Sequence, residues 1–336
     1  MPARIVTVSR RPAVQWMFET VEPILRDAGY AVISFRTEDE LHANPAALAD
    51  ADVLFAPGDL PVTRAMLLAA PRLRGLVCPF TGTEGFDQDA ATELGVVIAN
   101  GQTSENSDGM AEATILLALA SLYDLHGSEA VLRDNTPKPA HSRAFLLRDK
   151  TVGLLGYGQI ARAMTRRLAG WGVRLQAWSR RVDPAADPAV HWVGLEELLR
   201  TSDVVCVLLA LNAQTRGLLD ATRLALLKPS AVLVNTARGG IIDEAALVAL
   251  ARERPDMRIA LDTFEIEPLP PDSPLRGLPN TILTPHMLGH TVESHQVLPG
   301  VAVEAIARIL AAEPPRYVRN PAVLDAWRRR WAPIPT

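Results

Sequence analysis

The chain has 336 residues, of which 48% are hydrophobic and 21% charged, and its formal net charge is −4. This composition is typical of a soluble globular protein with two domains, and it gives no basic face for nucleic acid or an anionic membrane. No apolar run approaches the length of a membrane span. The first residues do not resemble a signal peptide, and Cys78 and Cys206 form no CxxC motif, so we expect a cytoplasmic protein.

Short β-branched runs alternate with helical patterns up to Asn100. Residues 14–28 and 87–94 have helical patterns, and the strand-like runs are RIVTV, AVISF, DVLFA, GLVC and GVVIA. This alternation predicts a parallel sheet with helices on both faces.

The next segment, SENSDGMAEATILLALASLYDL, predicts a long apolar helix. Ser107 or Asp108 is a candidate N-cap, and residues 115–122 are apolar almost all round. Such a helix bridges two domains, packs in a subunit interface, or is an ordinary core helix, and the sequence leaves all three open. The Pro-rich stretch RDNTPKPAHSRAFLLRDK that follows predicts a loop.

A second alternating set begins at Thr151, with the strand-like runs TVGLLG, VRLQAW, DVVCVLL, AVLVN, RIALD and TILT. It predicts a second doubly wound unit. Residues 292–312 then form one long amphipathic pattern with no strand after it. The last strand of the first unit is not followed by a helix that covers it, so this segment would cross back to do so. We therefore expect the second unit to be inserted into the first.

A glycine-rich turn follows the strand predicted at 151–155. Gly156 permits a tight turn, Gly158 lets the backbone approach a pyrophosphate, and the small Ala161 permits close packing of the next helix. The helix N-terminus favours phosphate binding. We predict a dinucleotide site; the alternatives are a tight turn without a ligand and an S-adenosylmethionine methyltransferase. The candidate cofactor-binding residues here are Gly156, Gly158, Gln159 and Ile160.

The end of the next strand indicates which dinucleotide binds. NAD enzymes usually place Asp or Glu there to bind the ribose 2′-hydroxyl. This chain has Ser179, Arg180 and Arg181 instead, and a hydroxyl with guanidinium groups would bind a 2′-phosphate. The sequence therefore favours NADP(H), with NAD(H) possible; the alternative is that both arginines belong to a solvated surface turn.

Three further segments follow strand ends of the second unit: NTARGGIIDEAAL, ALDTFEIEP and NTILTPHMLGH. Ligands bind at the carboxyl ends of strands in open parallel sheets, so Arg238, Glu267 and His286 are expected to point at one crevice. Each also has an ordinary structural explanation: a surface ion pair, a turn residue before Pro268, and a buried hydrogen-bonded imidazole.

These segments together, with VGLLGYGQIA, resemble the D-isomer-specific 2-hydroxyacid dehydrogenase family in order and spacing over nearly the whole chain. The resemblance implies an α/β fold of two doubly wound parallel-sheet domains. A Rossmann coenzyme domain, residues 104–288, would be inserted in a flavodoxin-like substrate domain formed by residues 1–103 and 289–336. It also implies a homodimer.

The resemblance implies residue roles as well. Arg238 would bind the substrate carboxylate and polarise the carbonyl, because a guanidinium fork fits a carboxylate. His286 would be the general acid/base, and Glu267 would orient it and favour its protonated form. The cofactor would exchange hydride with the 2-keto carbon while His286 protonates the oxygen. The remaining candidate cofactor-binding residues are Thr236, Ala237 and Asp262, the last contacting the nicotinamide carboxamide.

The first domain resembles the family less closely. In the stretch PFTGTEGFDQDAA, Thr81 and Gly82 would offer backbone N–H groups to the substrate carboxylate. Phe80 stands where the family often has Gly, which leaves the substrate range open.

Two features remain outside this scheme. His286, His290 and His295 invite a zinc hypothesis, but no further ligand pattern supports it, and we predict no metal. We expect His290 at the start of the C-terminal helix in a structural role, with substrate or subunit contact as alternatives. The tail AWRRRW, residues 326–331, is either a basic terminus with Trp packed on the surface, which we favour, or a strap over an active site.

The function expected is an NAD(P)-dependent D-2-hydroxyacid dehydrogenase, or 2-ketoacid reductase, that acts on a small anionic acid such as glyoxylate or hydroxypyruvate. Two alternatives share the fold: a non-catalytic dinucleotide-sensing protein that resembles a corepressor, and an oxidase of small anions that resembles formate dehydrogenase.

Overall fold

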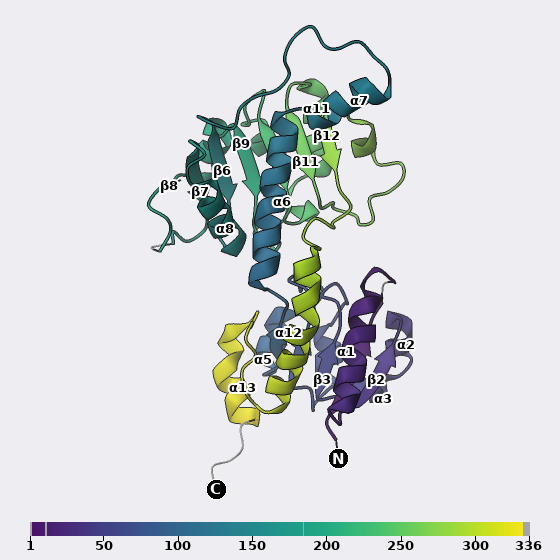
Figure 1. The fold of residues 1–336 in the computed structure, drawn as a ribbon. Helices are drawn as coiled ribbons and strands as arrows, with labels where there is room; N and C mark the ends of the chain where they lie inside the picture. Colours follow the sequence, from purple (N-terminus) through teal and green to yellow (C-terminus); the bar gives the residue numbers. More distant parts are fainter. Residues whose placement is uncertain (1, 11, 184, 332–336) are drawn as a thin grey trace. The chain divides into compact units, whose positions relative to one another are not determined.

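The structure is a computed structural model and describes residues 2–10, 12–183 and 185–331 (Figure 1). The chain forms two compact units. Unit 1 comprises Met1–Thr103 and Val292–Thr336, and unit 2 comprises Ser104–Thr291. The second boundary lies three residues after position 288, because the end of unit 2 packs on its first helix. A Cβ on Gly289 would lie 2.4 Å from the sulfur of Met110.

Unit 1 is built on a parallel sheet, which in the described residues has five strands in the order β2-β1-β3-β4-β5. This is the order of flavodoxin-like folds. The strands are short, and all but the edge strand β2, which is mostly half-buried, are nearly fully buried, since helices cover both faces. Their bounds are β1 Arg4–Val8, β2 Ala31–Phe35, β3 Val53–Phe55, β4 Gly75–Val77 and β5 Val97–Ala99.

Helices cover this sheet from segments far apart in the sequence. On one face, α1 (Gln15–Asp27) and α12 (Val292–Leu310) pack in one apolar cluster with strand residues. Helix α12, from the end of the chain, thus supplies the cover that the sheet of unit 1 does not obtain from residues 1–103, as expected. The other face packs against α2 Glu38–His42, α3 Pro45–Ala49, α4 Arg64–Leu68 and α5 Gln88–Glu93. The remaining elements are η1 Pro12–Val14, η4 Pro321–Val323 and α13 Leu324–Trp331.

The C-terminal helix α13 answers the question raised by the AWRRRW tail. Trp327 is fully buried, and its indole N–H donates to the carbonyl oxygen of Arg74 at 2.7 Å. Arg330 donates to two backbone carbonyls, those of Leu94 and Pro71. The guanidinium of Arg74 lies 4.9 Å from the ring centre of Trp331. These contacts fasten the tail to unit 1, in agreement with the packed-terminus interpretation.

Unit 2 is built on a second parallel sheet, with seven strands in its described residues, in the order β12-β11-β10-β9-β6-β7-β8. Counted from β6, this is the Rossmann order, which reverses between β6 and β9, with β12 added at one edge. The bounds are β6 Thr151–Leu155, β7 Arg174–Trp178, β8 Val190–Trp192, β9 Val204–Val207, β10 Val232–Asn235, β11 Arg258–Leu261 and β12 Thr281–Leu283. The edge strand β8 was not predicted, because its three residues show no apolar run.

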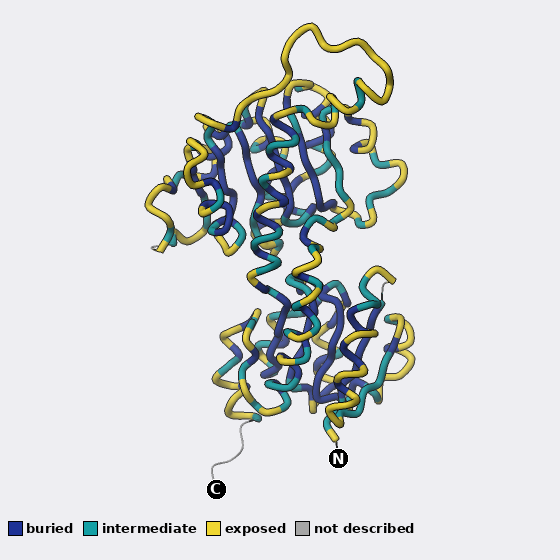
Figure 2. Tube along the Cα trace, viewed as in Figure 1, coloured by how far each residue is buried: buried dark blue, intermediate teal, exposed yellow. Residues whose placement is uncertain are grey.

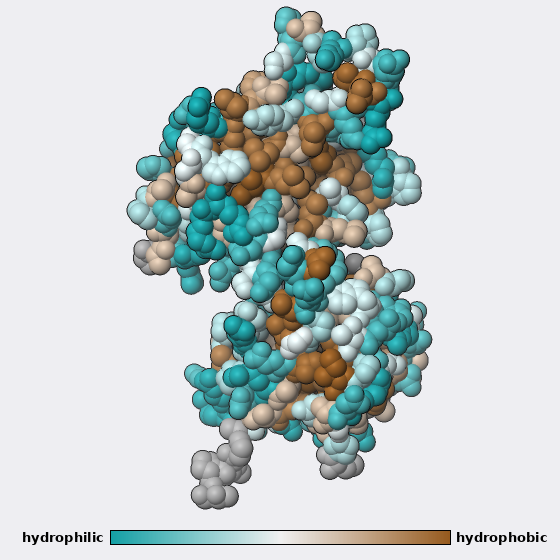
Figure 3. Space-filling view, viewed as in Figure 1, coloured by the Kyte–Doolittle hydropathy of each residue, from teal (hydrophilic) through white to brown (hydrophobic). Residues whose placement is uncertain are grey.

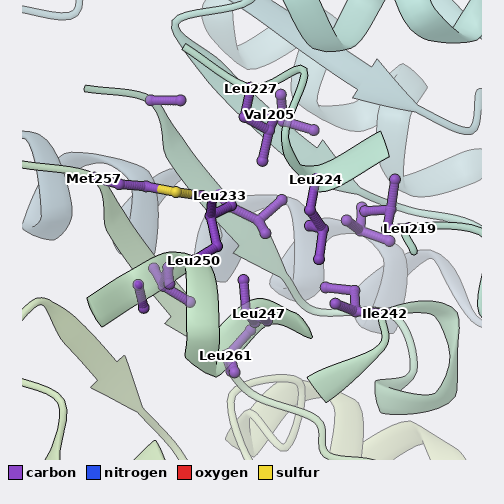
Figure 4. Packing of buried hydrophobic residues seen from close by; sticks show 14 of the residues in the cluster. Val205, Leu219, Leu224, Leu227, Leu233, Ile242, Leu247, Leu250, Met257 and Leu261 are labelled. Carbon is purple, nitrogen blue, oxygen red and sulfur yellow. The ribbon is translucent and has the colours of Figure 1, made fainter. Parts of the chain in front are cut away.

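Two apolar clusters hold helices to the two faces of this sheet. On one face lie α6 (Ser104–Leu122) and α8 (Gln159–Leu168). On the other lie α9 (Leu195–Thr201), α10 (Ala221–Leu224) and α11 (Glu244–Glu253). Figure 4 shows Leu224 of α10 and Leu247 and Leu250 of α11 in one cluster with Val205, Leu233 and Leu261 of the strands. The other elements are α7 Leu125–Arg133, η2 Gly239–Ile241 and η3 Pro274–Gly277.

The long helix α6 begins earlier than predicted, at Ser104, so neither Ser107 nor Asp108 is its N-cap. Its first turn is polar, and Glu105 lies where the helix dipole favours an acid. The Pro-rich segment after α7 is a loop, as predicted, and stands out as an exposed arm (Figure 2). Within the described residues, no single helix has the length and apolar character to span a membrane. Only α6 and α7 taken together reach that length and composition, and they are bent by 58° relative to each other.

Candidate active site

The glycine-rich loop connects β6 to α8 at the carboxyl edge of the unit 2 sheet. Gly156 has a φ of 107°, a conformation that glycine adopts without steric cost. A Cβ there would lie 2.9 Å from the carbonyl oxygen of Leu208, just after β9, so the loop lies where the strand order reverses. Gly158 caps α8 without a side-chain hydrogen bond. The first N–H groups of the helix, at Gln159 and Ile160, are therefore suited to an anionic ligand.

His286 and Glu267 form a hydrogen-bonded pair after two neighbouring strands. Nδ1 of His286 lies 2.7 Å from Oε2 of Glu267. The other carboxylate oxygen, Oε1, accepts the N–H of Phe264 at 3.0 Å, so both oxygens of Glu267 are fixed. His286 has a φ of 55°, a left-handed conformation that is uncommon outside glycine and is found at functional sites. Its side chain is 40% exposed, so the ring remains accessible to a ligand.

Asp262 holds the turn that carries His286. Its Oδ1 accepts a hydrogen bond from the Thr284 hydroxyl at 2.7 Å and another from the Met287 N–H at 3.2 Å, on either side of the histidine. Asp262 is 0% exposed, and its Oδ2 has no hydrogen-bond partner among the described residues. Burial raises the pKa of Asp262, although the Thr284 hydroxyl and the charge of His286 oppose the shift. A buried acceptor of this kind suits a ligand N–H group.

The surroundings of Glu267 favour its ionised form. Burial alone would raise its pKa. The hydrogen bond from His286 and the positive charge of that ring, with smaller contributions from the Phe264 N–H and the Arg238 guanidinium, outweigh burial and hold the pKa of Glu267 below its usual value. Glu267 is therefore a carboxylate at neutral pH, and it lies beside Nδ1 of His286.

Arg238 lies in a tight turn directly after β10. The Asn235 side chain closes this turn: its amide donates to the carbonyl oxygen of Arg238 at 3.0 Å, and its Oδ1 accepts the Ala237 N–H at 3.1 Å. Nη1 of Arg238 donates to the Ala237 carbonyl oxygen at 2.7 Å. Thr236 is buried, and its hydroxyl lies 2.8 Å from that of Thr114 in α6. The turn thus holds the guanidinium at the carboxyl edge of the sheet.

The segment after Arg238 touches the segment that carries Glu267. A Cβ on Gly239 would lie 1.8 Å from the carbonyl carbon of Phe264 and 2.3 Å from the backbone nitrogen of Glu265. Only glycine permits this approach. Arg238, Glu267 and His286, predicted from separate strand ends, are therefore brought to one edge of unit 2.

Comparisons with known proteins point the same way. Residues 115–287 match the model of the D-isomer specific 2-hydroxyacid dehydrogenase, NAD binding domain. A glyoxylate reductase of Thermofilum pendens is 32% identical over 76% of this chain and 77% of its own length. The chain belongs to the D-isomer specific 2-hydroxyacid dehydrogenase family.

Two further relatives bear on how far this membership reaches. A D-3-phosphoglycerate dehydrogenase of Mycobacterium tuberculosis is 34% identical over 80% of this chain but only 51% of its own length, so the chain spans about half of that relative. The crystal structure of a 2-hydroxyacid dehydrogenase from Ketogulonicigenium vulgare superposes with a TM-score of 0.79, at 27% identity, over 95% of this chain and 98% of that one. The two-unit fold is therefore that of the family.

The residues present fit the nicotinamide dinucleotide that the family's NAD-binding domain implies. The uncapped N-terminus of α8 suits a pyrophosphate, and the unpartnered Oδ2 of Asp262 suits the N–H of a carboxamide. The hydroxyl of Thr236 already faces Thr114, so this residue would contribute through its backbone.

The residues predicted to bind the 2′ position of the cofactor ribose follow the end of β7. Ser179 is half-buried, and Arg180 and Arg181 are exposed. The Arg180 guanidinium donates to the side-chain oxygen of Gln214, in the loop after β9. This partner was not predicted, since it lies 34 residues away in the sequence.

An acidic residue in the same segment is neutralised. Asp183, four positions after Ser179, forms an ion pair with Arg162 of α8. The guanidinium of Arg162 lies 5.5 Å from the ring centre of Tyr157, inside the glycine-rich loop. This pair ties the glycine-rich loop to the segment after β7, and sequence reasoning missed it because neither residue belongs to a motif.

Thr81 and Gly82, the predicted substrate-binding positions, lie in a loop of unit 1 after β4. The carbonyl oxygen of Thr81 accepts from the Asn100 side chain at 2.7 Å, and that of Gly82 accepts from the Cys78 thiol at 3.1 Å. A Cβ on Gly58 would lie 1.7 Å from the Gly82 carbonyl oxygen, so two loops meet closely here. The loop is thus fixed by its carbonyl groups.

The other histidines near His286 are placed separately. His290 lies just before α12, which begins at Val292, and its N–H donates to the Met287 carbonyl oxygen at 2.9 Å. The His295 ring stacks on Trp16 at 4.5 Å between ring centres, and burial lowers its pKa. In the part of the chain that the structure describes, no group of three or more His, Cys, Asp or Glu side chains is placed to hold a metal ion.

A cavity of about 280 Å³ lies at the opposite, amino edge of the unit 2 sheet. Its lining includes Ser121, Arg143, Arg258 and Asn280, and none of the predicted site residues. Arg258 donates from there to the carbonyl oxygens of Ser121 and Leu122, at the end of α6. This cavity is therefore separate from the catalytic candidates at the carboxyl edge.

Proposed function

We propose that the protein is an NAD(P)-dependent D-2-hydroxyacid dehydrogenase that reduces a small 2-keto acid, with NADPH as the preferred cofactor. The observation that carries the proposal is the His286–Glu267 pair, with 2.7 Å between Nδ1 and Oε2, beside Arg238 and the dinucleotide loop of one sheet. The names of the relatives, a glyoxylate reductase and a D-3-phosphoglycerate dehydrogenase, support the same class of substrate.

The chemistry follows from the side chains. Arg238 binds the substrate carboxylate through two parallel N–H bonds and draws electron density from the neighbouring carbonyl. Because Nδ1 of His286 is paired with Glu267, the other ring nitrogen, Nε2, gives its proton to the ketone oxygen. A bound reduced nicotinamide supplies the hydride that makes the 2-keto carbon a CH–OH group. On unit 1, the backbone N–H groups of Thr81 and Gly82 remain the proposed contacts for the carboxylate.

The experiment that tests this function is an initial-rate assay of NADPH and NADH oxidation with a panel of 2-keto acids that includes glyoxylate and hydroxypyruvate. Turnover of at least one acid, faster with NADPH, is expected. Tight cofactor binding without turnover of any acid would support the dinucleotide sensor instead. Cofactor reduction by formate, with no turnover of 2-keto acids, would support the oxidase of small anions.

The cofactor preference gives a prediction of its own. Replacing Ser179 by Asp places a carboxylate beside Arg180 and Arg181, where it repels a 2′-phosphate and accepts a ribose hydroxyl. The ratio of kcat/KM for NADPH to that for NADH is expected to fall about tenfold or more, as one lost charge-assisted hydrogen bond costs about 1.5–3 kcal/mol. Thr222→Asp, an exposed position in α10, is the matched control. An unchanged ratio would refute the 2′-phosphate hypothesis.

We also propose that two copies associate through the α6 side of unit 2. Apolar side chains gather over α6 on the face shown in Figure 3. Large apolar side chains are exposed along α6, α7 and the arm: Leu116, Tyr123, Leu125, Leu132, Phe145 and Leu146. Exposed apolar surface of this kind marks protein interfaces.

The expected mass in solution is that of two chains, measured by light scattering during size-exclusion chromatography. Leu116, 54% exposed, is the position to change, and Leu116→Glu is expected to shift the mass toward one chain, because the charge would be buried in the interface. The matched control is Leu68→Glu in unit 1, at a position 60% exposed. A single-chain mass for the unaltered protein would contradict the association.

A further inference from the structure

The turn that carries Glu267 is fastened by two carboxylates. It follows β11, and the N–H of Phe264 in it donates to Oε1 of Glu267 itself at 3.0 Å. The next N–H, that of Glu265, donates to Oε1 of Glu244, in another segment of the chain. Two consecutive amides are thus held by two acids, one inside the turn and one outside it.

Glu244 is well placed to act as the outer anchor. It is the first residue of α11, directly after Asp243, whose side chain accepts the Ala246 N–H at 2.9 Å and so fixes the helix start. The opposite side of the turn rests on Gly239, whose backbone touches Phe264 and Glu265. The stretch from Gly239 to Glu244 therefore holds the turn at two points. The position of the turn relative to β11 determines where the carboxylate of Glu267 lies.

Charge also connects Glu244 to the pair. Burial raises the pKa of Glu244; the Glu265 N–H opposes this, and the negative charges of Glu265 and Glu267 add to it. The charged groups facing the Glu267–His286 pair are Arg238 and Asp262. Glu265 lies in the same turn as Glu267, and Glu244 is bound to that turn. Glu244 is thus a half-buried acid whose charge interacts with Glu267.

We infer that Glu244 is a positioning residue for the Glu267–His286 pair, with two separable effects. Its hydrogen bond to Glu265 holds Glu267 in line with the imidazole, and its negative charge keeps the proton on the pair to higher pH. The inference deepens the proposed function and rests on it, since the proton concerned is the one that reaches the substrate.

The direction of the charge effect follows from the two states of the pair. With the imidazole protonated, Glu267 and His286 together are neutral; after the proton leaves, the pair carries one negative charge. A neighbouring carboxylate opposes the second state, so it postpones proton loss. Removing the charge of Glu244 is therefore expected to move the titration of the pair to lower pH.

Three variants of Glu244 separate the effect of its hydrogen bond from the effect of its charge. Glu244→Gln keeps an oxygen that can accept the Glu265 N–H and loses the charge. Glu244→Asp keeps the charge on a side chain one carbon shorter, which loses the hydrogen bond. Glu244→Ala loses both. Glu253→Gln, exposed at the other end of α11, is the matched control.

Two readouts are needed. The first is the titration of the His286 ring followed by NMR in the protein without substrate, with its signal assigned by its loss in His286→Gln. The variants Glu244→Gln and Glu244→Ala are expected to lower the pH of the titration midpoint, whereas Glu244→Asp and the control Glu253→Gln leave it unchanged. The second is kcat for 2-ketoacid reduction. This kcat is expected to fall about tenfold or more in Glu244→Asp and Glu244→Ala, because the Glu267–His286 pair is misplaced. In Glu244→Gln it is expected to stay near the original value.

An unchanged ring titration in Glu244→Gln would overturn the charge effect, and an unchanged kcat in both Asp and Ala would overturn the anchor. A fall in kcat that is equal in Gln, Asp and Ala, without any titration shift, would reduce Glu244 to a structural residue. Failure of the proposed function looks different: the unaltered protein would turn over no 2-keto acid, while the ring titration still reports on Glu244.

Discussion

Replacing His286 by alanine is expected to lower kcat for 2-ketoacid reduction by about 10²–10⁴-fold, the usual contribution of a positioned general acid. The ring lies on a turn fixed by Asp262 and is paired with Glu267 at 2.7 Å. Cofactor binding, measured by quenching of protein fluorescence, is expected to change little, because the phosphate-binding loop lies after a different strand.

His290→Ala is the matched control, four positions away in the same segment, and should retain most of the activity. Glu267→Gln should also lower kcat, since it leaves the ring without an anion. Because the pKa of Glu267 is held below its usual value, activity should persist as the pH falls and be lost only when this carboxylate gains a proton. Near-normal activity in His286→Ala would remove the histidine from the mechanism.

Replacing Arg238 by alanine is expected to lower kcat/KM by about 10³-fold or more, since two hydrogen bonds between charged groups, each worth about 1.5–3 kcal/mol, are lost. Arg238→Lys keeps the charge but not the fork, and one lost bond predicts a fall of about 10–100-fold. KM should rise in both variants, because the substrate carboxylate is bound before the chemistry begins. Initial rates over a range of substrate concentrations give both constants.

Arg252→Ala, on the exposed side of α11, is the control for the loss of an arginine. The alanine variant at 238 has a second expected effect: without this guanidinium the pKa of Glu267 rises, so the activity that remains should be lost at a higher pH as the solution is acidified. An unchanged KM in Arg238→Ala would show that the substrate carboxylate is bound elsewhere.

Much of the fold could be predicted because its signals are local. Buried parallel strands read as continuous apolar runs, and the glycine turn after the strand at 151–155 identifies the dinucleotide unit. Polar residues after strand ends converge in any doubly wound sheet, which is why Arg238, Glu267 and His286 could be grouped before the structure was known. The insertion of unit 2 into unit 1 followed from a helix without a strand after it.

What the sequence could not provide depends on contacts between distant residues. The left-handed φ of His286 occurs in a turn held by hydrogen bonds from Thr284 and Met287 to Asp262, a residue of another strand end, and these contacts cannot be read from the local sequence. Gln214, the partner of Arg180, lies in the loop after β9, and Glu244, the partner of Glu265, is the first residue of α11. β8 was missed because an edge strand of three residues is stabilised by its neighbour β7, not by its own composition.

The central claim, that this chain transfers hydride to a 2-keto acid, is tested most directly with reduced cofactor that carries deuterium at the transferable position. The protein is incubated with this cofactor and glyoxylate or hydroxypyruvate, and the product is analysed by mass spectrometry. The account predicts a 2-hydroxy acid with one deuterium on carbon 2, formed by the unaltered protein and almost lost in His286→Ala. Cofactor that binds but leaves no deuterium in any product would contradict it.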